Sequence, residues 1–429
     1  MLNLANRIAF LSLGREGLRM TKVIIIGAGL AGLAAALELK VHGIGAVILE
    51  AAQQAGGRAI TVTTATGTTV DLGAHWLHGD GTPLKALVEA YGIACRADTA
   101  DNMLICENGT ARHADSEDWL DSALDHKKAD AVRHGTLADC PLPDLGKNAR
   151  ARKMLTEFGL MWNGVEPPLE PSAYEFLSDE NTPGGLQPHG GIGAVIAAMA
   201  RTVEPIDFGK VVTAISGDDN GVEVRSADQA WRADYALVTA SLGVLKSGAL
   251  AFDPPLNAGM MAHLDGITMG TMNKIVAEVE PAFFAARAIP DDMSVELLDG
   301  DPPHFCHVRS AGLPLISLYV CGKHAAAVES MDSRAARAYL QRVLAPVKQL
   351  AGFEDHMVGE AICSAWVGNP FTRGAYSACL PGARRSGPRF QGRVGFCGDA
   401  FDERFPASLA GAFRSGQAAA REIARLTTF

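Results

Sequence analysis

Residues 23–32 read VIIIGAGLAG and decide the fold of this chain. Four apolar residues predict a buried strand, and the glycines after them predict a tight turn into a helix. Gly27 permits the turn, Gly29 lets the backbone approach a pyrophosphate, and Gly32 lets the helix pack closely on the sheet. The phosphates then lie at a helix N-terminus, where unpaired N–H groups and the helix dipole favour negative charge.

A second strand follows this helix and ends in an acidic residue. Residues 47–50 read VILE, so Glu50 falls about 20 residues after the glycines, where a carboxylate meets the ribose hydroxyls of an adenosine. Glycine-rich turns also occur in sheets that bind nothing, but here strand, glycines, helix, strand and acid follow in order. Residues 56–58, Gly-Gly-Arg, add a second phosphate-facing element and favour a flavin dinucleotide over NAD.

Composition narrows the class of protein. A chain of 429 residues is longer than one typical domain, so we expect two domains that share a large core. The net charge of −10 argues against a nucleic-acid partner and would attract a cationic substrate, although it also serves solubility. Eight scattered cysteines without a Cys-x-x-Cys pair predict reduced thiols and a cytoplasmic location. No apolar run approaches the roughly 20 residues that span a membrane.

The order of strand and helix patterns predicts an α/β protein with a discontinuous Rossmann-like FAD-binding domain and an inserted α+β substrate-binding domain. We assign residues 21–82, 186–262 and 386–429 to the first domain. Residues 83–185, expected to be helical, and residues 263–385 form the second. Residues 1–20 are expected to be a disordered leader or a stretch upstream of the true start, with a targeting remnant as the alternative.

Individual elements are predicted from periodicity and turn residues. Residues 236–240 read as a buried strand that returns the chain to the sheet containing residues 23–26. The other predictions are a hairpin over 61–71, helices over 190–203, 333–350 and 411–426, and strands over 210–215, 222–225, 273–279, 315–320 and 393–396.

Six segments together resemble the flavin-dependent amine oxidase family, which includes monoamine oxidases, polyamine oxidases and flavin histone demethylases. They are residues 27–32 with Glu50, 56–58, 73–79, 238–246 with 252–256, 270–275, and 366–416. The resemblance covers residues 22–423 and is closest in motif to polyamine oxidases. It implies that FAD is held by Gly27, Ala28, Gly29, Leu30, Ala31, Gly32, Glu50, Ala51, Gly57, Arg58, Gly73, Ala74, His75, Trp76, Val212, Gly398, Asp399, Ser408, Leu409 and Ala412.

The resemblance makes Lys274 the first candidate catalytic residue. In the family, the lysine of the Asn-Lys-Ile motif holds a water against flavin N5, where hydride arrives and oxygen later reacts. Burying an ammonium is costly unless it finds partners or sheds its charge. The alternative is that Lys274 only ends a strand at the protein surface.

Aromatic residues are expected to form a slot above the flavin. By the family pattern, Tyr376 is one wall, with Trp366 packed nearby and Trp76 also in the pocket. Ser408 stands where monoamine oxidases carry a second tyrosine, which predicts a wider slot for a longer amine. Phe401 replaces a small residue and is expected to narrow the pocket. The alternative for each aromatic residue is plain core packing.

His78 is the third candidate catalytic residue, because polyamine-cleaving members place His or Glu at this position in the substrate tunnel. A histidine that titrates near neutrality can exchange a proton with an amine. His75 and His78 can also be read as half of a metal site, but no third ligand has suitable spacing, so no metal is predicted.

Some positions depart from the family pattern. Gln54 replaces an arginine, and Asp399 replaces a glutamate. Ala375 stands where monoamine oxidases carry the cysteine that bonds the flavin, so FAD is expected to be non-covalent.

The expected reaction is FAD-dependent oxidation of a primary or secondary amine, favouring a polyamine or acetylpolyamine. Hydride would leave the α-carbon, the imine would hydrolyse to an aldehyde and an amine, and O2 would become H2O2. The alternatives are a related flavoenzyme acting on an amino acid or other monoamine, possibly as a dehydrogenase, and a protein that keeps FAD structurally. An amino-acid oxidase would need an arginine to clamp a carboxylate. Acidic residues for distal ammonium groups are available in residues 83–185 and 291–301, and the oligomeric state is left open.

Overall fold

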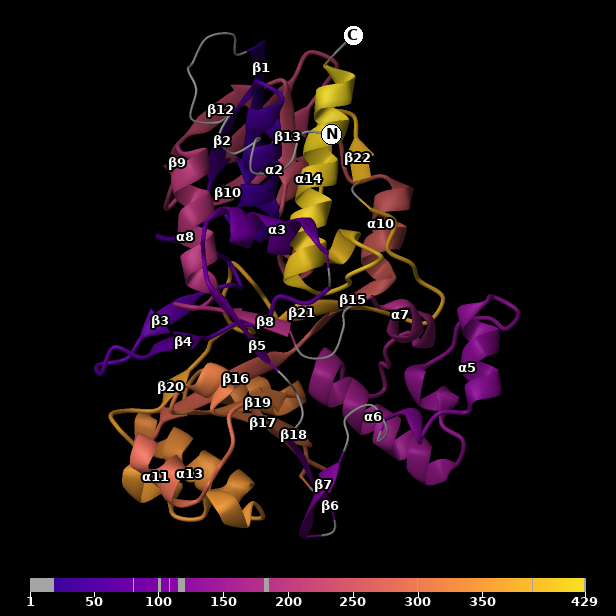
Figure 1. The fold of residues 1–429 in the computed structure, drawn as a ribbon. Helices are drawn as coiled ribbons and strands as arrows, with labels where there is room; N and C mark the ends of the chain where they lie inside the picture. The colour runs from indigo at the N-terminus through magenta and orange to yellow at the C-terminus, as the bar shows by residue number, and fades with distance from the viewer. Residues whose placement is uncertain are drawn as a thin grey trace.

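The computed structural model describes residues 19–79, 81–98, 102–107, 109–114, 120–180, 185–298, 300–387 and 389–427. Most of the expected leader, residues 1–18, lies outside them. Strand β1 begins at Arg19, so residues 19 and 20 belong to the sheet and not to a leader. The chain forms two lobes, one built on the sheet around β1 and one on the sheet around β16 (Figure 1).

The first lobe is built on a six-stranded sheet. Its strands run parallel except for β22 at one edge. The second half of β1, residues 23–26, is apolar because both of its faces are buried. Val23 and Ile25 face helices, while Ile24 and Ile26 face a second sheet. The order is β22 (Arg389–Gln391), β23 (Val394–Phe396), β13 (Tyr235–Val238), β1 (Arg19–Ile26), β2 (Ile44–Leu49) and β9 (Ile206–Asp207).

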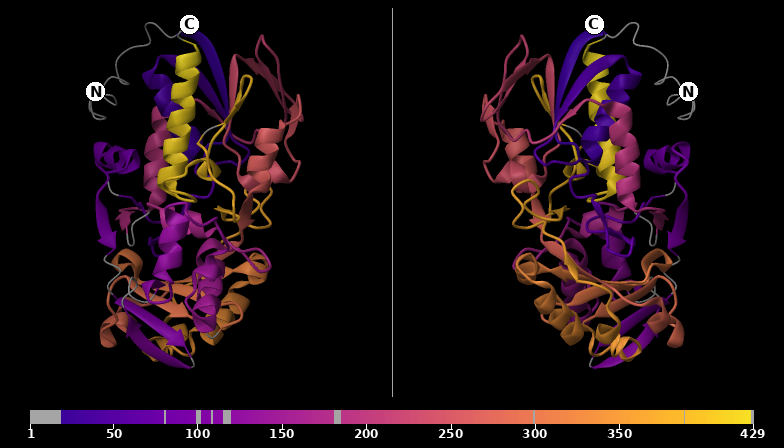
Figure 2. Two further views of the ribbon diagram at one scale, coloured as in Figure 1. Left: turned by 90° about the vertical axis from the view of Figure 1, so that its right-hand side faces the viewer. Right: turned by 90° about the vertical axis from the view of Figure 1, so that its left-hand side faces the viewer.

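Helices cover one face of this sheet and a smaller sheet covers the other, as Figures 1 and 2 show. The helices are α2 (Leu30–Val41), α3 (Pro83–Ala90), α8 (Ile192–Val203) and α14 (Leu409–Leu426). The smaller sheet has the order β12 (Ala230–Ala233), β11 (Val222–Ser226), β10 (Val212–Gly217) and β14 (Ala251–Asp253). The elements come from the start, middle and end of the chain, which confirms the predicted discontinuous α/β domain.

The second lobe is built on a seven-stranded sheet with two different faces. Ile275 and Ala277 of one strand pack against helices, while Met272 and Lys274 point to the opposite face. This alternation follows from the period of two in a strand. The order is β20 (Ile362–Cys363), β16 (Met272–Glu278), β19 (Leu315–Cys321), β18 (His304–Val308), β17 (Met293–Leu297), β6 (Asn102–Glu107) and β7 (Thr110–Ala114).

The prediction that residues 83–185 are helical is wrong in part. Strands β6 and β7 join the seven-stranded sheet, and β5 (Cys95–Asp98) pairs with β8 (Gly185–Pro188). The apolar run Met103–Cys106 is too short for periodicity to separate strand from helix, and pairing with the distant β17 decides. The helical remainder has a core of its own and contains η1 (Leu142–Leu145), α5 (His126–Arg133), α6 (Ala149–Asn163) and α7 (Ala173–Ser178).

Two short strand pairs and several helices complete the fold. Helix α13 ends at Leu344, before Pro346, and not at residue 350 as predicted. The pairs are β3 (Thr61–Thr63) with β4 (Thr69–Asp71), as predicted, and β15 (Ile267–Gly270) with β21 (Tyr376–Cys379). The helices are α9 (Leu242–Lys246), α10 (Ala258–Asp265), α11 (Pro281–Ala286), α12 (Ala325–Val328), α13 (Ser333–Leu344), η2 (Ser310–Gly312), η3 (Gly322–His324), η4 (Lys348–Leu350), η5 (Phe353–His356) and η6 (Asp399–Phe401).

All eight cysteines are free thiols, as expected from their scattered positions. Within the described part of the chain, no helix combines the length and apolar character that crossing a membrane requires.

Candidate active site

A cavity of about 1080 Å³ is lined by residues of both lobes. It begins at the glycine-rich turn after β1 and extends to the face of the seven-stranded sheet that bears Lys274. The predicted site residues on its wall are Gly27, Gly29, Leu30, Ala31, Glu50, Ala51, Gly57, Arg58, Gly73, Ala74, His75, Trp76, His78, Val212, Lys274, Trp366, Tyr376, Gly398, Asp399, Ser408, Leu409 and Ala412.

The glycine-rich turn fits a dinucleotide. A Cβ on Gly32 would lie 2.0 Å from the Gly27 carbonyl oxygen, so Gly32 serves helix packing and not the wall. A Cβ on Gly29 would meet no protein atom closer than 4.0 Å, and its backbone is extended. Packing therefore does not require a glycine at position 29, but a ligand passing close to the backbone would. The N-terminus of α2 has no side-chain cap, so its N–H groups suit phosphate oxygens.

Glu50 is held at the end of β2 by two backbone amides. Its carboxylate accepts hydrogen bonds from the N–H groups of Ala28, at 2.6 Å, and Ala52, at 2.8 Å. Ala28 thus contributes its backbone, while its methyl group is buried away from the cavity wall. The carboxylate is thus fixed on the cavity wall, and its contact with the ribose hydroxyls of the nucleotide stays a prediction.

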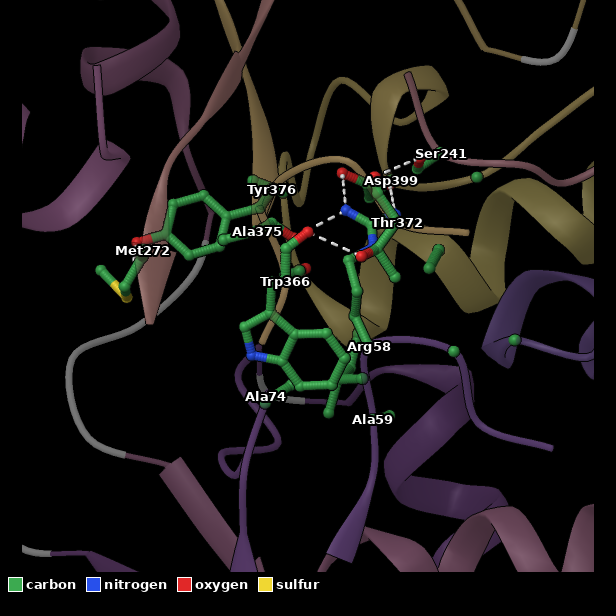
Figure 3. A pocket seen from close by; sticks show the side chains of 18 of the residues that line it. Arg58, Ala59, Ala74, Ser241, Met272, Trp366, Thr372, Ala375, Tyr376 and Asp399 are labelled. Carbon is green, nitrogen blue, oxygen red and sulfur yellow. Dashed lines mark hydrogen bonds and ion pairs between the residues drawn. The ribbon is translucent and has the colours of Figure 1, made fainter. Parts of the chain in front are cut away.

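Arg58 and Asp399 form an ion pair on the cavity wall, with 2.6 Å between Nη2 and Oδ1 (Figure 3). Arg58 also donates to the carbonyl of Ala375. Burial alone would raise the pKa of Asp399, but Arg58, Arg385 and the Ser377 hydroxyl outweigh it and lower that pKa to about 2. The sequence analysis did not identify Arg385 or Ser377, because their link to Asp399 depends on β21 lying beside η6.

Lys274 lies in the middle of β16 and its side chain is 5% exposed, so the alternative of a surface lysine is wrong. Its Nζ donates to the carbonyls of Asp71, at 3.0 Å, and Gly73, at 2.6 Å, and lies 3.2 Å from His75 Nδ1. Burial lowers the pKa of Lys274 to about 8, while the Asp71 carboxylate opposes part of that shift. The lysine can therefore change its charge near neutral pH.

His75 and Tyr319 surround Lys274 on the cavity side. Burial, followed by the charge of Lys274, lowers the pKa of His75 well below its ordinary value, so the ring is neutral. The Tyr319 hydroxyl lies 3.2 Å from both ring nitrogens of His75, and Lys274 Nζ lies 4.9 Å from the centre of the Tyr319 ring. The sequence analysis missed Tyr319, whose only signal is a hydroxyl within the apolar strand β19.

Tyr376 and Trp366 stand together on the wall, as Figure 3 shows. The Tyr376 hydroxyl donates to the carbonyl of Trp162, and the Trp366 indole N–H donates to the carbonyl of Leu72. Burial raises the pKa of Tyr376 well above its ordinary value. Both rings are fixed by their polar ends, so their faces are available to a substrate. Their role as a substrate slot stays a prediction.

Ser408 and His78, two further residues predicted to line the pocket, both lie on the cavity wall. Ser408 caps α14, because its Oγ accepts a hydrogen bond from the Gly411 N–H at 3.1 Å and donates to the Phe405 carbonyl. The ring of His78 lies 5.7 Å from that of Trp76. Both residues border the cavity, and their roles toward substrate stay predictions.

The prediction that Phe401 narrows the pocket is wrong. Its side chain is 2% exposed, stacks on His263 with 4.7 Å between ring centres, and belongs to the core under the sheet. Phe401 is not on the cavity wall, since the short helix η6 turns it into that core. Burial of this large apolar ring stabilises the folded protein.

Glu296 is an acidic wall residue that the sequence analysis did not single out. Its carboxyl is 4% exposed, and its Oε2 has no hydrogen-bond partner among the described residues. Burial raises the pKa of Glu296 to about 8, while the neighbouring Trp162 opposes the rise. A buried carboxyl with one oxygen that accepts no hydrogen bond suits a ligand that brings its own positive charge.

Glu296 and Lys274 lie in one row across the seven-stranded sheet. Strand pairing sets Lys274 opposite Tyr319, Tyr319 opposite Phe305, and Phe305 opposite Glu296. All four side chains line the cavity. Three strand spacings separate the ends of the row, which is about 14 Å between Cα atoms. No local sequence pattern reveals this row, because it depends on the register of four strands.

Comparison with known proteins identifies the family. Residues 30–179 and 145–424 match the family described as flavin containing amine oxidoreductase. The chain belongs to this family. Membership of this family identifies FAD as the cofactor. The glycine-rich turn at Gly29 and the part of the cavity wall formed by Arg58 and Asp399 agree with this.

Similar proteins include plant demethylase-type proteins and a polyamine oxidase. FLOWERING LOCUS D of Arabidopsis thaliana is 28% identical over 94% of this chain, and lysine-specific histone demethylase 1 homolog 3 of Oryza sativa subsp. indica is 28% identical over 96%. The chain spans 55% of the length of each. Polyamine oxidase 2 of Arabidopsis thaliana is 26% identical, with 94% of this chain and 88% of that protein covered.

Solved structures share the fold. Putrescine oxidase bound to putrescine superposes with a TM-score of 0.78 at 19% identity, covering 94% of this chain and 98% of that one. Cyclohexylamine oxidase from Brevibacterium oxydans gives a TM-score of 0.79 at 18% identity, covering 95% and 100%. These likenesses confirm the Rossmann-like flavoprotein fold.

Proposed function

We propose that this protein oxidises an amine that carries a second positive charge, a diamine or a polyamine, with FAD as cofactor and O2 as the final electron acceptor. The observation that carries the proposal is Glu296, a buried carboxyl on the wall of the cavity that also contains Lys274. A substrate ammonium would donate to the Glu296 Oε2 atom, which accepts no hydrogen bond from the described residues.

The surface between Glu296 and Lys274 suits a methylene chain. Phe305 and Tyr319 are the two intervening members of the row, and their rings lie 5.0 Å apart. Aromatic faces bind methylenes through dispersion and attract an ammonium through the ring quadrupole. One end of a substrate would lie at Glu296 and the other near Lys274.

When bound, FAD takes hydride from the amine's α-carbon and passes the electrons to O2, giving H2O2 and an imine that water hydrolyses to an aldehyde and an amine. The reacting nitrogen must be neutral. His75 is a neutral acceptor, and Lys274 loses its charge near pH 8, so the catalytic end of the row tolerates an uncharged amine. At the other end, a substrate ammonium would lower the pKa of Glu296 and pair with the resulting carboxylate.

Other substrates are supported less well. Three arginines line the cavity, Arg58, Arg133 and Arg373. Arg58 is committed to Asp399 and to the Ala375 carbonyl, so it is not free to clamp the carboxylate of an amino acid. The names of similar proteins support both the polyamine and the histone-lysine classes. The buried carboxyl favours a small cation that enters the cavity completely.

The test is anaerobic mixing of the FAD-loaded protein with spermine, spermidine, acetylspermine, putrescine, benzylamine, amino acids and a methylated lysine peptide. Flavin absorbance is followed, and air is then readmitted. We expect rapid bleaching by a diamine or polyamine, and peroxide on readmission of air. Bleaching by amino acids, benzylamine or the peptide alone would contradict the proposal, as would no bleaching at all.

A further inference from the structure

Asp98, on the cavity wall, and Asp292 and His307, behind it, bring three possible ligand atoms together. Asp98 ends β5, Asp292 precedes β17, and His307 lies within β18. One atom from each lies within 4.8 Å of the others. His307 Nε2 is 3.7 Å from Asp98 Oδ2 and 3.9 Å from Asp292 Oδ1. These separations are too long for direct hydrogen bonds and leave room for a small ion between the three groups.

His307 has no hydrogen-bond partner in the described part of the chain. Its side chain is fully buried, and neither ring nitrogen has a hydrogen-bond partner there. An unpaired polar group in a protein interior is costly, and an ion or water is a usual reason that one persists.

Three acidic side chains and two guanidinium groups lie at and around the cluster. Arg96 pairs with Asp291 at 2.8 Å and Asp292 at 3.1 Å, and Arg309 pairs with Asp291 at 2.6 Å. Asp98 accepts hydrogen bonds from two neutral donors, Trp76 Nε1 at 2.6 Å and Gln187 Nε2 at 3.1 Å. Three carboxylates thus face two guanidinium groups, which gives this set of five a net negative charge.

We propose that Asp98, Asp292 and His307 bind a divalent transition-metal ion, with zinc as the best match to the donor set. An imidazole ligand favours zinc over magnesium or calcium, which prefer oxygen ligands alone. In a tetrahedral zinc site with bonds of about 2.0–2.1 Å, neighbouring ligand atoms lie about 3.4 Å apart. The two distances to His307 Nε2 need to shorten by only about half an ångström to reach this spacing. A water would take the fourth position.

Hydrogen bonds already orient the two carboxylates. Trp76 and Gln187 both donate to Asp98 Oδ2, and the Ala311 N–H, at 2.7 Å, donates to Asp292 Oδ1. These are the oxygens nearest to His307 Nε2, so an ion would share them with the donors or bind the second oxygen of each carboxylate. A substrate ammonium fits the cluster less well, because Asp292 and His307 are buried and are not on the cavity wall. The prediction of no metal considered His75 and His78, neither of which belongs to this cluster.

The site is independent of the proposed amine substrate, so its test uses metal binding and not activity. FAD-loaded protein is dialysed against metal-free buffer, and its zinc content is measured by mass spectrometry. Chelator-treated protein is then titrated with ZnCl2 against a chromophoric chelator. We expect about one zinc per chain. Chelation should lower the unfolding midpoint, since an ion that binds only the folded state stabilises it.

Variants assign the site to these residues. H307F removes the imidazole at similar size, and D292N removes one carboxylate. We expect each to weaken zinc binding at least about tenfold. The matched control is H263F, because His263 is another buried imidazole with two unpartnered nitrogens but stacks on Phe401. FAD absorbance and circular dichroism establish that each variant is folded.

A wild-type protein that neither contains nor takes up zinc would overturn the proposal, even if H307F and D292N fail to fold. Equal zinc binding by wild type and all three variants would also overturn it.

Discussion

Gly29 and Gly56 form a parallel β-bridge between the turn after β1 and the turn before β3. A Cβ atom on Gly29 would lie 4.0 Å from the Gly56 carbonyl oxygen, which would be its nearest protein contact. The two turns therefore come together without filling the space beside Gly29. That space is on the cavity wall, at the N-terminus of α2.

The change G29A tests whether this space belongs to FAD. The protein should tolerate the added methyl, because the Gly29 backbone is extended and no protein atom is in close contact. FAD affinity should fall at least about tenfold, or 1.4 kcal/mol. Equilibrium titration of the apoprotein measures it, with G259A, a glycine in α10 whose Cβ would have ordinary contacts, as control. Unchanged FAD affinity in G29A would place the pyrophosphate elsewhere.

The charge of Lys274 should control reaction with oxygen. Below its pKa of about 8 the lysine is a cation, and a fixed positive charge favours the formation of reduced, negatively charged oxygen species. The rate at which reduced flavin reacts with O2 should fall as pH rises through about 8 in the wild type, and should be slower and independent of pH in K274M. Stopped-flow mixing with oxygenated buffer measures both. An equal pH dependence in K274M would show that another group is responsible.

The change D399N should destabilise the protein by about 3 kcal/mol at pH 7, because it leaves the Arg58 guanidinium without its carboxylate and removes the negative charge that faces Arg385. The pKa of Asp399 is lowered on folding, so its stabilising contribution is present above its ordinary pKa and is lost as pH falls through about 2. The difference between wild type and D399N should therefore be nearly constant from pH 5 to 8. Urea unfolding measures it, with the exposed Asp228 as control in D228N. A loss no larger than that of D228N would mean that the ion pair contributes little.

Ser408 caps α14 through its contact with the Gly411 N–H. S408A should reduce the free energy of unfolding by about 1 kcal/mol, while S408T should retain most of the stability because threonine keeps the acceptor oxygen. Thermal and urea unfolding give both values. An equal loss in the two variants would trace the effect to packing and not to the cap.

The parts of the fold and site that the sequence predicts are those encoded locally. Gly27, Gly29 and Glu50 follow one another within a single strand–helix–strand unit, and Lys274 lies in a motif of consecutive residues. Their positions on the cavity wall follow from local chain geometry. Arg58 and Asp399 were identified separately, but their ion pair was not.

The parts that sequence patterns missed depend on distant pairing. Glu296 and Tyr319 join Lys274 only through the register of β16, β19, β18 and β17. The short apolar run in β6 has no decisive period, so its pattern does not separate a strand from a helix. Phe401 was placed in the pocket by analogy with a neighbouring motif, and the direction of one short helical turn sends it to the core.

The most direct test of a substrate with two charges is the effect of E296Q on the preference for a diamine over the monoamine that lacks its second nitrogen. Steady-state kcat/KM is measured for both, using the best diamine of a series of increasing length. E360Q is the control, because Glu360 is exposed. We predict that E296Q lowers the diamine preference at least about tenfold, equivalent to 1.4 kcal/mol, while E360Q leaves it unchanged. An unchanged preference in E296Q would contradict the account.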